Sequence, residues 1–373
     1  MSEIKVNSIK GVGATAAAIT VNNSDGTCTA NITSNGNSQL ANRNKVINGG
    51  MMIHQRGDQS ATGSAAYLSC DRFFTNNGSG AQVAAIKSTD TPDGFAASTK
   101  WDCTTADTSI AAGDYFIIQH RMEGQNLQDF AKGTSSAKQF ALSFYIKATK
   151  TGVYTVELED TDNARVCSKT ITVSDTNWNR YSLIYPADTT GSFNNDNLNS
   201  LTLNFWLIAG STYTSGTLQS SAWGSRTNAN RASSSNVNAM DSTSNDFYLT
   251  GVQLEVGGVV TDFEHRSYAQ ELLLCQRYYR VIKDGSEDSG GYLGCVSYNY
   301  DVNSVVTQIN FIPEMRATPS ADSTVGTNYY RFYRNSGYSD INSMSVLNGM
   351  GRKGGAFNNA CLLYTSPSPR DRG

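Results

Sequence analysis

Short segments in which apolar and polar residues alternate constrain the fold of this chain more than any other feature. The clearest are FALSFYIKA at 140–148 and VYTVELE at 153–159. A period of two directs one side of an extended strand toward a core and the other toward polar surroundings. We therefore expect two rows of side chains to point inward: Phe140, Leu142, Phe144 and Ile146 from the first segment, and Tyr154, Val156 and Leu158 from the second.

The same kind of short, strand-like segment recurs through residues 44–266 and predicts many strands joined by polar turns. Only 16% of the residues are charged and 33 are glycine, which suits strands and turns better than long helices. DTDN at 160–163 is a turn signal, and Gly251 permits a bulge in the last strand. The predicted fold class is all-β, with an antiparallel β-sandwich (jelly-roll) body. The expected strands are 45–54, 82–87, 114–122, 140–148, 153–159, 166–173, 180–186, 201–208 and 247–256.

The segment before the sandwich, residues 1–43, is predicted to form a thin N-terminal β stem for oligomerisation and attachment. It contains no Phe, Trp or Tyr, and its first Leu is Leu40, so it cannot build a globular core of its own. Its Val and Ile rows are expected to be buried against other copies of the chain. Asp-Gly at 25–26 predicts a tight turn between two of its strands.

Three further regions follow the sandwich. SYAQELLLCQRYYRVIK at 267–283 predicts a helical connector with Leu272, Cys275 and Tyr279 on one side. Residues 284–360 again contain strand-like segments, which predict a truncated second small β domain. The tail CLLYTSPSPRDRG at 361–373 resembles the translation of a sequencing-library adapter, so we exclude it from the reading of the fold.

Charge and cysteine usage exclude several classes of protein. A net charge of −3 argues against a nucleic-acid partner, and no apolar run is long enough for membrane insertion. The first residues lack the apolar segment of a secretion signal, which indicates synthesis in a cytoplasm. The seven cysteines contain no CxxC pair, which favours buried free thiols over disulfides or zinc.

The sequence offers little for catalysis. The three histidines are scattered, no GxSxG elbow occurs, and Glu157, Glu159 and Asp160 are expected to be solvated around a hairpin. We therefore predict that the chain is not an enzyme and needs no cofactor. A structural calcium ion held by Asp160, Asp162 and Asp196 is left as an open alternative.

A sugar site needs an exposed aromatic ring beside amide, carboxylate or guanidinium groups. The polar loop SAWGSRTNANRASSSN at 221–236 supplies Trp223, Arg226, Asn228, Asn230 and Arg231. The alternative for Trp223 is a loop anchor packed against the sandwich. The second candidate group is Tyr292, Tyr298 and Tyr300, whereas Trp101, Trp178 and Trp206 are expected to pack in the core.

Several segments resemble the tail-fibre or appendage proteins of tailed, marine-type bacteriophages. The resemblance rests on residues 42–57, 70–74, 119–130, 142–158, 247–279 and 313–319, of which GVQLEVGG with the following CQRYY is the most specific part. It implies a jelly roll like carbohydrate-binding modules, a homotrimeric fibre in the virion tail, and host-surface glycans and other phage tail proteins as partners. A purely structural tail or baseplate connector and a polysaccharide depolymerase are the alternative functions.

Overall fold

The structure, a computed structural model, divides the chain into two compact units, Met1–Arg266 and Ser267–Gly373. The tail at 361–373 and its predicted adapter origin lie outside the described residues. The described residues are 8–9, 19–21, 28–30, 42–282, 297–301, 304–320, 326–334, 337–346 and 350–360.

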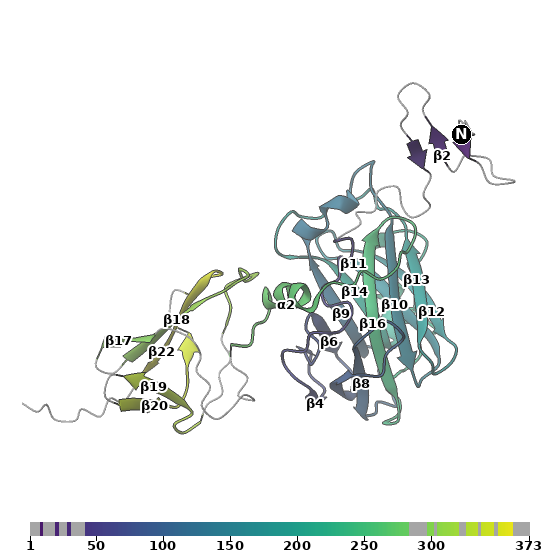
Figure 1. Ribbon diagram of the computed structural model, residues 1–373. Coiled ribbons are helices and arrows are strands. Elements are labelled where there is room, and N and C mark those ends of the chain that lie inside the picture. Colours follow the sequence, from purple (N-terminus) through teal and green to yellow (C-terminus); the bar gives the residue numbers. More distant parts are fainter. Residues whose placement is uncertain are drawn as a thin grey trace, which may run out of the picture. The chain divides into compact units, whose positions relative to one another are not determined.

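The body of the first unit is an antiparallel two-layer sandwich (Figure 1). One layer is a six-stranded sheet in the order β13-β10-β16-β8-β7-β4. Its strands are β4 (Gln59–Thr62), β7 (Gln82–Ser88), β8 (Ser98–Thr105), β10 (Phe140–Ala148), β13 (Asn179–Tyr185) and β16 (Asp246–Val256).

The other layer is a seven-stranded sheet in the order β15-β12-β11-β14-β9-β6-β5. The chain crosses repeatedly between the layers, so that β9, β10 and β11 alternate between them, and the all-β jelly-roll sandwich prediction is confirmed. The strands of this sheet are β5 (Ala66–Tyr67), β6 (Phe73–Asn77), β9 (Tyr115–Glu123), β11 (Gly152–Asp160), β12 (Arg165–Val173), β14 (Asn199–Ala209) and β15 (Gly224–Ser225). Short helices in the connections are η1 (Gly124–Asn126), η2 (Gln128–Phe130), α1 (Ser211–Thr214) and η3 (Asn228–Asn230).

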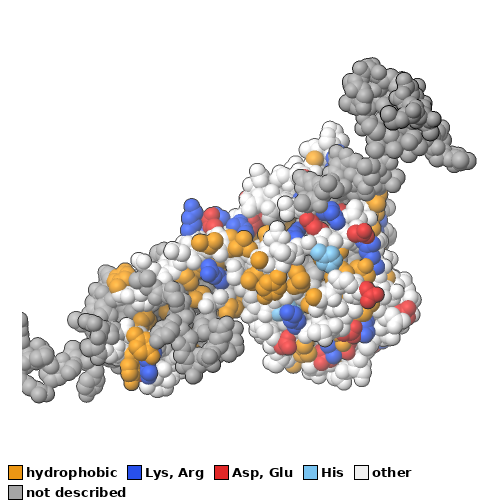
Figure 2. All heavy atoms as spheres, in the orientation of Figure 1, with side chains coloured by type: hydrophobic (Ala, Val, Ile, Leu, Met, Phe, Trp, Pro, Cys, Tyr) orange, Lys and Arg blue, Asp and Glu red, His pale blue; other side chains and the backbone are white. Residues whose placement is uncertain are grey.

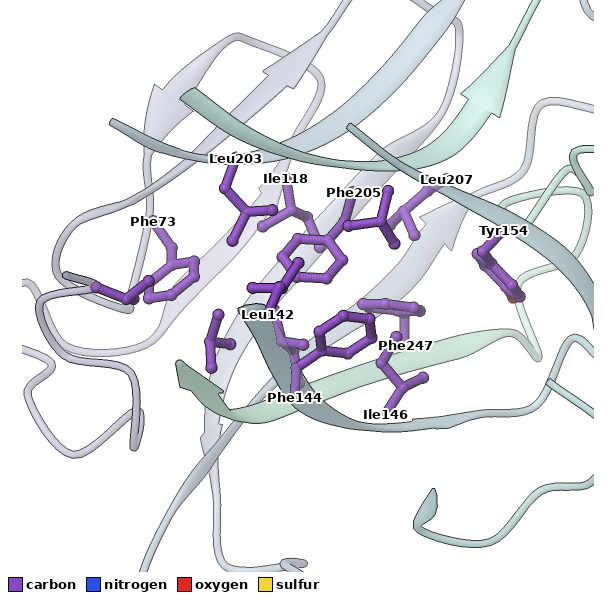
Figure 3. Close-up of a cluster of buried hydrophobic side chains, with 14 of the residues drawn as sticks. Phe73, Ile118, Leu142, Phe144, Ile146, Tyr154, Leu203, Phe205, Leu207 and Phe247 are labelled. Atoms are coloured by element: carbon purple, nitrogen blue, oxygen red, sulfur yellow. The ribbon is translucent and has the colours of Figure 1, made fainter. Parts of the chain in front are cut away.

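The hydrophobic core lies between the two sheets (Figure 3). The alternation in β10 and β11 directs side chains inward as predicted, and all seven of the expected residues are buried. Phe144 of β10 meets Phe205 of β14 edge to face, with ring centroids 5.0 Å apart. Burial of each such aromatic side chain contributes about 1.5–3 kcal/mol, so these rows hold the sheets together.

The segment at 45–54 is not a strand, contrary to prediction. Asn48 and Met51 have positive φ angles of 61° and 51°, and the chain turns there. The Asn48 side chain satisfies the backbone in place of a neighbouring strand, because its Oδ1 accepts from the N–H groups of Met52 and Ile53 at 3.0 Å each. Asparagine tolerates the left-handed conformation, and an apolar run around it was therefore misread as extended.

The predicted bulge at Gly251 is confirmed. The pairing of β16 with β10 shifts register between Ser143 and Tyr145, opposite Gly251, whose φ is 63°. A Cβ atom at this position would lie 2.8 Å from the rings of Phe95 and Tyr145. Both the backbone conformation and the available space therefore require glycine here.

Three short strands are described near the amino terminus: β1 (Ser8–Ile9), β2 (Ile19–Val21) and β3 (Cys28–Ala30). They form an antiparallel sheet in the order β1-β2-β3, with Val21 opposite Cys28. The Asp-Gly turn at 25–26 lies between β2 and β3 but outside the described residues. The expected burial against other copies of the chain stays a prediction.

The second unit begins with α2 (Tyr268–Gln276), which is shorter than the predicted 267–283. Ser267 caps this helix in a capping box with Gln270. Cys275 is buried, and a small apolar core forms around Ile309 and Phe311. Its other elements are a four-stranded sheet, β17 (Ser297–Asp301), β18 (Ser304–Asn310), β22 (Gly354–Ala360) and β21 (Ser345–Val346), and a hairpin, β19 (Tyr330–Arg334) and β20 (Gly337–Ile341).

Two other sequence expectations can be compared with the described part of the chain. Cys70, Cys103, Cys167 and Cys275 are buried free thiols. No helix within the described ranges is long and apolar enough to cross a membrane. On the face drawn in Figure 2, basic and acidic side chains of the first unit are interspersed.

Candidate functional site

A polar groove of about 350 Å³ opens on the outward face of the seven-stranded sheet. Its floor comes from β6, β9, β14 and β11, and one wall comes from the loop between β14 and β16. The lining residues are Asn76, Tyr115, Ile117, Gln119, Arg121, Glu159, Thr161, Asn199, Thr202, Trp206, Tyr213, Asn228 and Arg231.

Strand register brings the polar floor together. Asn204 of β14 lies opposite Gln119 of β9 on one side and Glu157 of β11 on the other. Gln119 Nε2 donates to Asn204 Oδ1 at 2.7 Å, and Asn204 Nδ2 donates to Glu157 Oε2 at 2.8 Å. The three side chains therefore form a connected row across three strands, which fixes their orientation.

Two arginines from the loop close one side of the row. Arg231 is bidentate to Glu157, with Nε and Nη2 at 2.8 and 2.7 Å from its two oxygens, and Nη2 also lies 2.7 Å from Glu159 Oε2. Arg226 Nη1 lies 2.5 Å from Glu159 Oε1. Planar, bidentate pairs of this kind are the stronger charge-assisted hydrogen bonds.

Glu157 and Glu159 both form ion pairs with arginine. Burial alone raises the pKa of the Glu159 carboxyl, but the guanidinium groups of Arg231 and Arg226 outweigh burial and hold that pKa below its usual range. Burial opposes the charge of Arg231, yet Glu157 and Glu159 raise the pKa of its guanidinium. Glu159 and Arg231 are thus ionised at neutral pH.

Aromatic rings border the groove on the side of α1. Tyr213 packs on Trp206 and Tyr115, with ring centroids 5.2 and 5.7 Å apart. The Arg231 guanidinium lies 5.3 Å from the centroid of the Trp206 ring. Trp206 is buried, as expected, but it belongs to this outer cluster and not to the core between the sheets.

Only some of the site residues predicted in the polar loop at 221–236 reach the groove. Asn228 and Arg231 line it, and Arg226 reaches it through Glu159. Asn230 is half-buried at the end of η3 and does not line the groove.

Trp223 is separated from these residues. Its side chain is only 6% exposed and packs at 5.3 Å from Phe140, and its Nε1 donates to the Pro186 carbonyl at 2.8 Å. This is the loop-anchor arrangement considered as the alternative. The structure therefore does not bring the Trp223 ring to the surface beside the loop arginines.

The second predicted group lies in the second unit. Tyr298 is 47% exposed on β17, whereas Tyr292 and the side chain of Tyr300 lie outside the described residues. The β19–β20 hairpin, which was not singled out, exposes Tyr333 and Tyr338 on directly opposite positions.

The expectation that Glu157, Glu159 and Asp160 are solvated is wrong. All three are buried, at 0%, 6% and 0% exposure. Arginines neutralise the two glutamates, and Lys132 Nζ lies 2.5 Å from Asp160 Oδ2. A charge on a hairpin strand can be buried when a distant loop supplies its partner, which spacing along the chain does not reveal.

The three aspartates named for calcium do not share one set of contacts. Asp160 pairs with Lys132, Asp162 accepts from Asn194, and Asp196 accepts from the Leu198 N–H group. No group of three or more His, Cys, Asp and Glu side chains suited to a metal ion occurs among the residues that the structure describes. A calcium ion at the three aspartates stays a prediction.

The floor residues Gln119, Arg121 and Thr202 were missed by sequence reasoning. They are the outward members of alternating strands, which the strand pattern itself marks as facing away from the core. Arg121 lies directly opposite Thr202, and Thr202 opposite Glu159. Only the order of strands in the sheet shows that these residues belong together.

The fold and the groove together define an antiparallel β-sandwich with a preorganised polar depression on one sheet. No protein-family model and no curated protein matches the chain. Three solved structures illustrate what it is similar to. A structure described as "CBM4 structure and function" has 13% identity and a TM-score of 0.31, over 57% of this chain and 99% of that chain.

The second is the family 11 carbohydrate-binding module of the cellulosomal cellulase Lic26A-Cel5E of Clostridium thermocellum. It has 13% identity and a TM-score of 0.27, over 56% of this chain and 99% of that chain. The third is the enzymatically active domain of bacteriophage CBA120 tailspike protein 4, with 15% identity and a TM-score of 0.29, over 57% of this chain and 21% of that chain. All three TM-scores lie below 0.5, so these likenesses do not indicate what this chain binds.

Proposed function

We propose that this chain is a non-catalytic glycan-binding protein and that the groove on the seven-stranded sheet is its saccharide site. The observation that carries the proposal is the set of amide, hydroxyl and guanidinium groups already oriented toward one depression by hydrogen bonds to each other. Saccharides offer hydroxyls that both donate and accept, and groups fixed before binding lose little entropy when they meet them. The rings of Tyr115 and Tyr213 at the border supply apolar surface for sugar C–H groups.

The charge state of the groove supports binding over hydrolysis. A glycosidase uses one carboxylic acid that stays protonated beside a second carboxylate. The carboxyl group that lines this groove, Glu159, has a lowered pKa and is held by two arginines. It is therefore a poor proton donor at neutral pH.

At a finer level, we propose that the chain is a tail-fibre or appendage protein of a tailed bacteriophage that recognises host-surface glycans. The support is the sequence resemblance that covers most of residues 42–319. In this reading the chain is a homotrimer in the virion tail, attached to other tail proteins through residues 1–43. Three tethered copies raise avidity even when each site is weak.

The test is binding of the full chain to a panel of immobilised bacterial surface glycans. Asn228→Trp places a large side chain at the exposed mouth of the groove, and we expect loss of about tenfold or more in affinity, or about 1.4 kcal/mol. Thr176→Trp adds the same ring at an exposed position that does not line the groove and should bind normally.

Other results would point to the other functions. Binding to no glycan at all would contradict the proposal and favour a structural connector. Release of new reducing ends from a bound polysaccharide would favour a depolymerase. Light scattering tests the oligomer separately, and a monomer at micromolar concentration would contradict the trimer.

A further inference from the structure

Arg121 differs from the other two arginines at the groove. Arg226 and Arg231 each form ion pairs with Glu159, and Arg231 also pairs with Glu157. Arg121 lines the groove as well, but it has no carboxylate oxygen within 4.0 Å among the residues that the structure describes. Among the arginines at this site, Arg121 is therefore the one whose positive charge has no carboxylate partner at close range within the described residues.

The guanidinium of Arg121 is held in a defined orientation. It lies 4.2 Å from the centroid of the Phe74 ring, a cation–π arrangement that supports its flat side. One terminal nitrogen, Nη2, donates to Gln119 Oε1 at 3.0 Å, and Gln119 is itself fixed by Asn204. A guanidinium has five N–H donors, so most of its donor capacity remains available at the groove.

The remaining charges of the groove compensate each other. Glu157 and Glu159 are matched by Arg226 and Arg231, and the lowered pKa of Glu159 keeps it ionised at neutral pH. Arg121 therefore adds an uncompensated positive charge to the groove, although the whole chain has a net charge of −3. In a depression with low-dielectric walls, such a charge attracts anions more strongly than the same charge on an open surface.

We infer that the groove binds an acidic saccharide, one that bears a carboxylate, and that Arg121 is the residue that recognises this carboxylate. The planar fork of the guanidinium matches the two oxygens of a carboxylate, which gives both affinity and a fixed orientation of the sugar. Gln119 and Thr202 lie beside Arg121 and supply partners for neighbouring hydroxyls. This inference rests on the proposed function, because it names the class of glycan for the same groove.

The experiment uses matched pairs of oligosaccharides and isothermal titration calorimetry on the full chain. Oligogalacturonate, oligomannuronate and a glucuronate-containing oligosaccharide are each compared with the same material after reduction of the carboxyl groups to alcohols. We expect at least one acidic member to bind about tenfold more tightly than its reduced counterpart, the factor that about 1.4 kcal/mol represents. Raising NaCl from about 50 mM to about 500 mM should weaken the acidic ligand and leave the reduced one unchanged, because salt screens the ion pair.

Variants test whether Arg121 is responsible for the preference for the acidic ligand. Arg121→Gln should lower the affinity for the acidic ligand much more than the affinity for the reduced ligand, and so remove the preference. Arg121→Lys keeps the charge but loses the fork, and should retain part of the preference. Arg180→Gln removes an exposed arginine that does not line the groove and should change neither affinity.

The failures are distinguishable. If acidic and reduced ligands bind equally, or if Arg121→Gln lowers both affinities equally, the inference is wrong while the glycan-binding proposal stands. If no ligand of either set binds and the glycan panel is also negative, both are wrong. Should Arg121→Gln not fold, the salt dependence and Arg121→Lys decide the same question.

Discussion

Two of the buried charge clusters in the described part of the first unit differ in how far they are sealed from solvent. In one, Lys132 lies between Asp160 and Asp188, at 2.5 and 3.0 Å, and the three side chains are at most 5% exposed. In the other, Arg231 joins Glu157 and Glu159, while its own side chain is 12% exposed and that of Arg226 is 41% exposed. Both place a cation between two carboxylates, but only the second adjoins the groove.

The sealed cluster has every feature of a structural cross-link. Lys132 Nζ also donates to the carbonyls of Thr190 and Gly191, at 3.0 and 2.7 Å, and lies beneath the rings of Phe193 and Trp223. It thus joins loops that are far apart in sequence. The open cluster keeps donors and ring edges within reach of a ligand, and this contrast is why we assign binding to one and stability to the other.

The largest effect is expected from Lys132→Met. This change leaves Asp160 and Asp188 buried with much of their partner charge removed, and loss of one member of a buried ion pair costs about 3–5 kcal/mol. The free energy of unfolding, measured by urea denaturation, should fall by that amount. Glycan affinity of the folded protein should not change.

A matched control is available on the surface. Lys147 lies 2.6 Å from Asp90, nearly the same distance as in the sealed pair, but the two side chains are 31% and 42% exposed. Lys147→Met should cost less than about 1 kcal/mol. Equal losses from the two variants would show that burial does not separate these pairs and would end the comparison.

Local alternation along the chain was sufficient to predict much of the sandwich. Strand β10 could be predicted because its apolar rows have a period of two. Strand β8 could not, because STKWDCTT has only two apolar residues, Trp101 and Cys103, among its buried side chains. The buried turn around Asn48 was misread since its apolar residues carry no sign of the side-chain hydrogen bonds that replace a neighbouring strand.

The site was less accessible from the sequence than the fold. Arg226, Asn228 and Arg231 were found because they lie in one conspicuously polar loop. Gln119 and Arg121 come from a strand about 100 residues earlier, and only the pairing of β9 with β14 places them beside Glu157 and Glu159. Non-local pairing of this kind leaves no signal in a single sequence.

Acidification is expected to lower the free energy of unfolding by a smaller amount. It acts through a buried histidine that belongs to neither charge cluster. Burial lowers the pKa of the His120 imidazole well below its ordinary value, and the nearby Arg72 guanidinium lowers it further. The unfolded chain binds a proton below about pH 6.5 that the folded chain excludes, so stability is full above that pH and falls as the pH decreases. Between about pH 7 and about pH 5 this single group should cost up to about 2 kcal/mol, the limit set by the ordinary pKa of the unfolded imidazole.

The carboxyl groups of Asp188 and Glu159, one from each charge cluster, should not respond in that pH window. Burial raises the pKa of the Asp188 carboxyl, but Arg165 and Lys132 outweigh it and hold that pKa below the ordinary value, as the arginines do for Glu159. Their contribution is present above about pH 4 and is lost as the pH falls through the lowered values. Urea midpoints of the wild type and His120→Gln at both pH values measure the difference, and an equal slope in the two proteins would contradict the assignment to His120.

Within the two clusters, the smaller change in stability, and the sharpest test of the comparison, is expected from Glu157→Gln. The amide keeps the shape of the side chain, but its NH2 group cannot accept, so at least one of the hydrogen bonds from Arg231 and Asn204 is lost, whereas Arg231 retains Glu159 as a partner. Because Arg231 is also partly solvated through the groove, we expect a loss of about 1–2 kcal/mol in the free energy of unfolding, in the range of a hydrogen bond to a charged group. Glycan affinity should fall more than stability suggests, since the row from Gln119 to Arg231 loses its fixed orientation. If Glu157→Gln destabilises the protein as much as Lys132→Met and leaves glycan binding intact, then the open cluster is a structural cross-link like the sealed one, and the groove beside it is not the saccharide site.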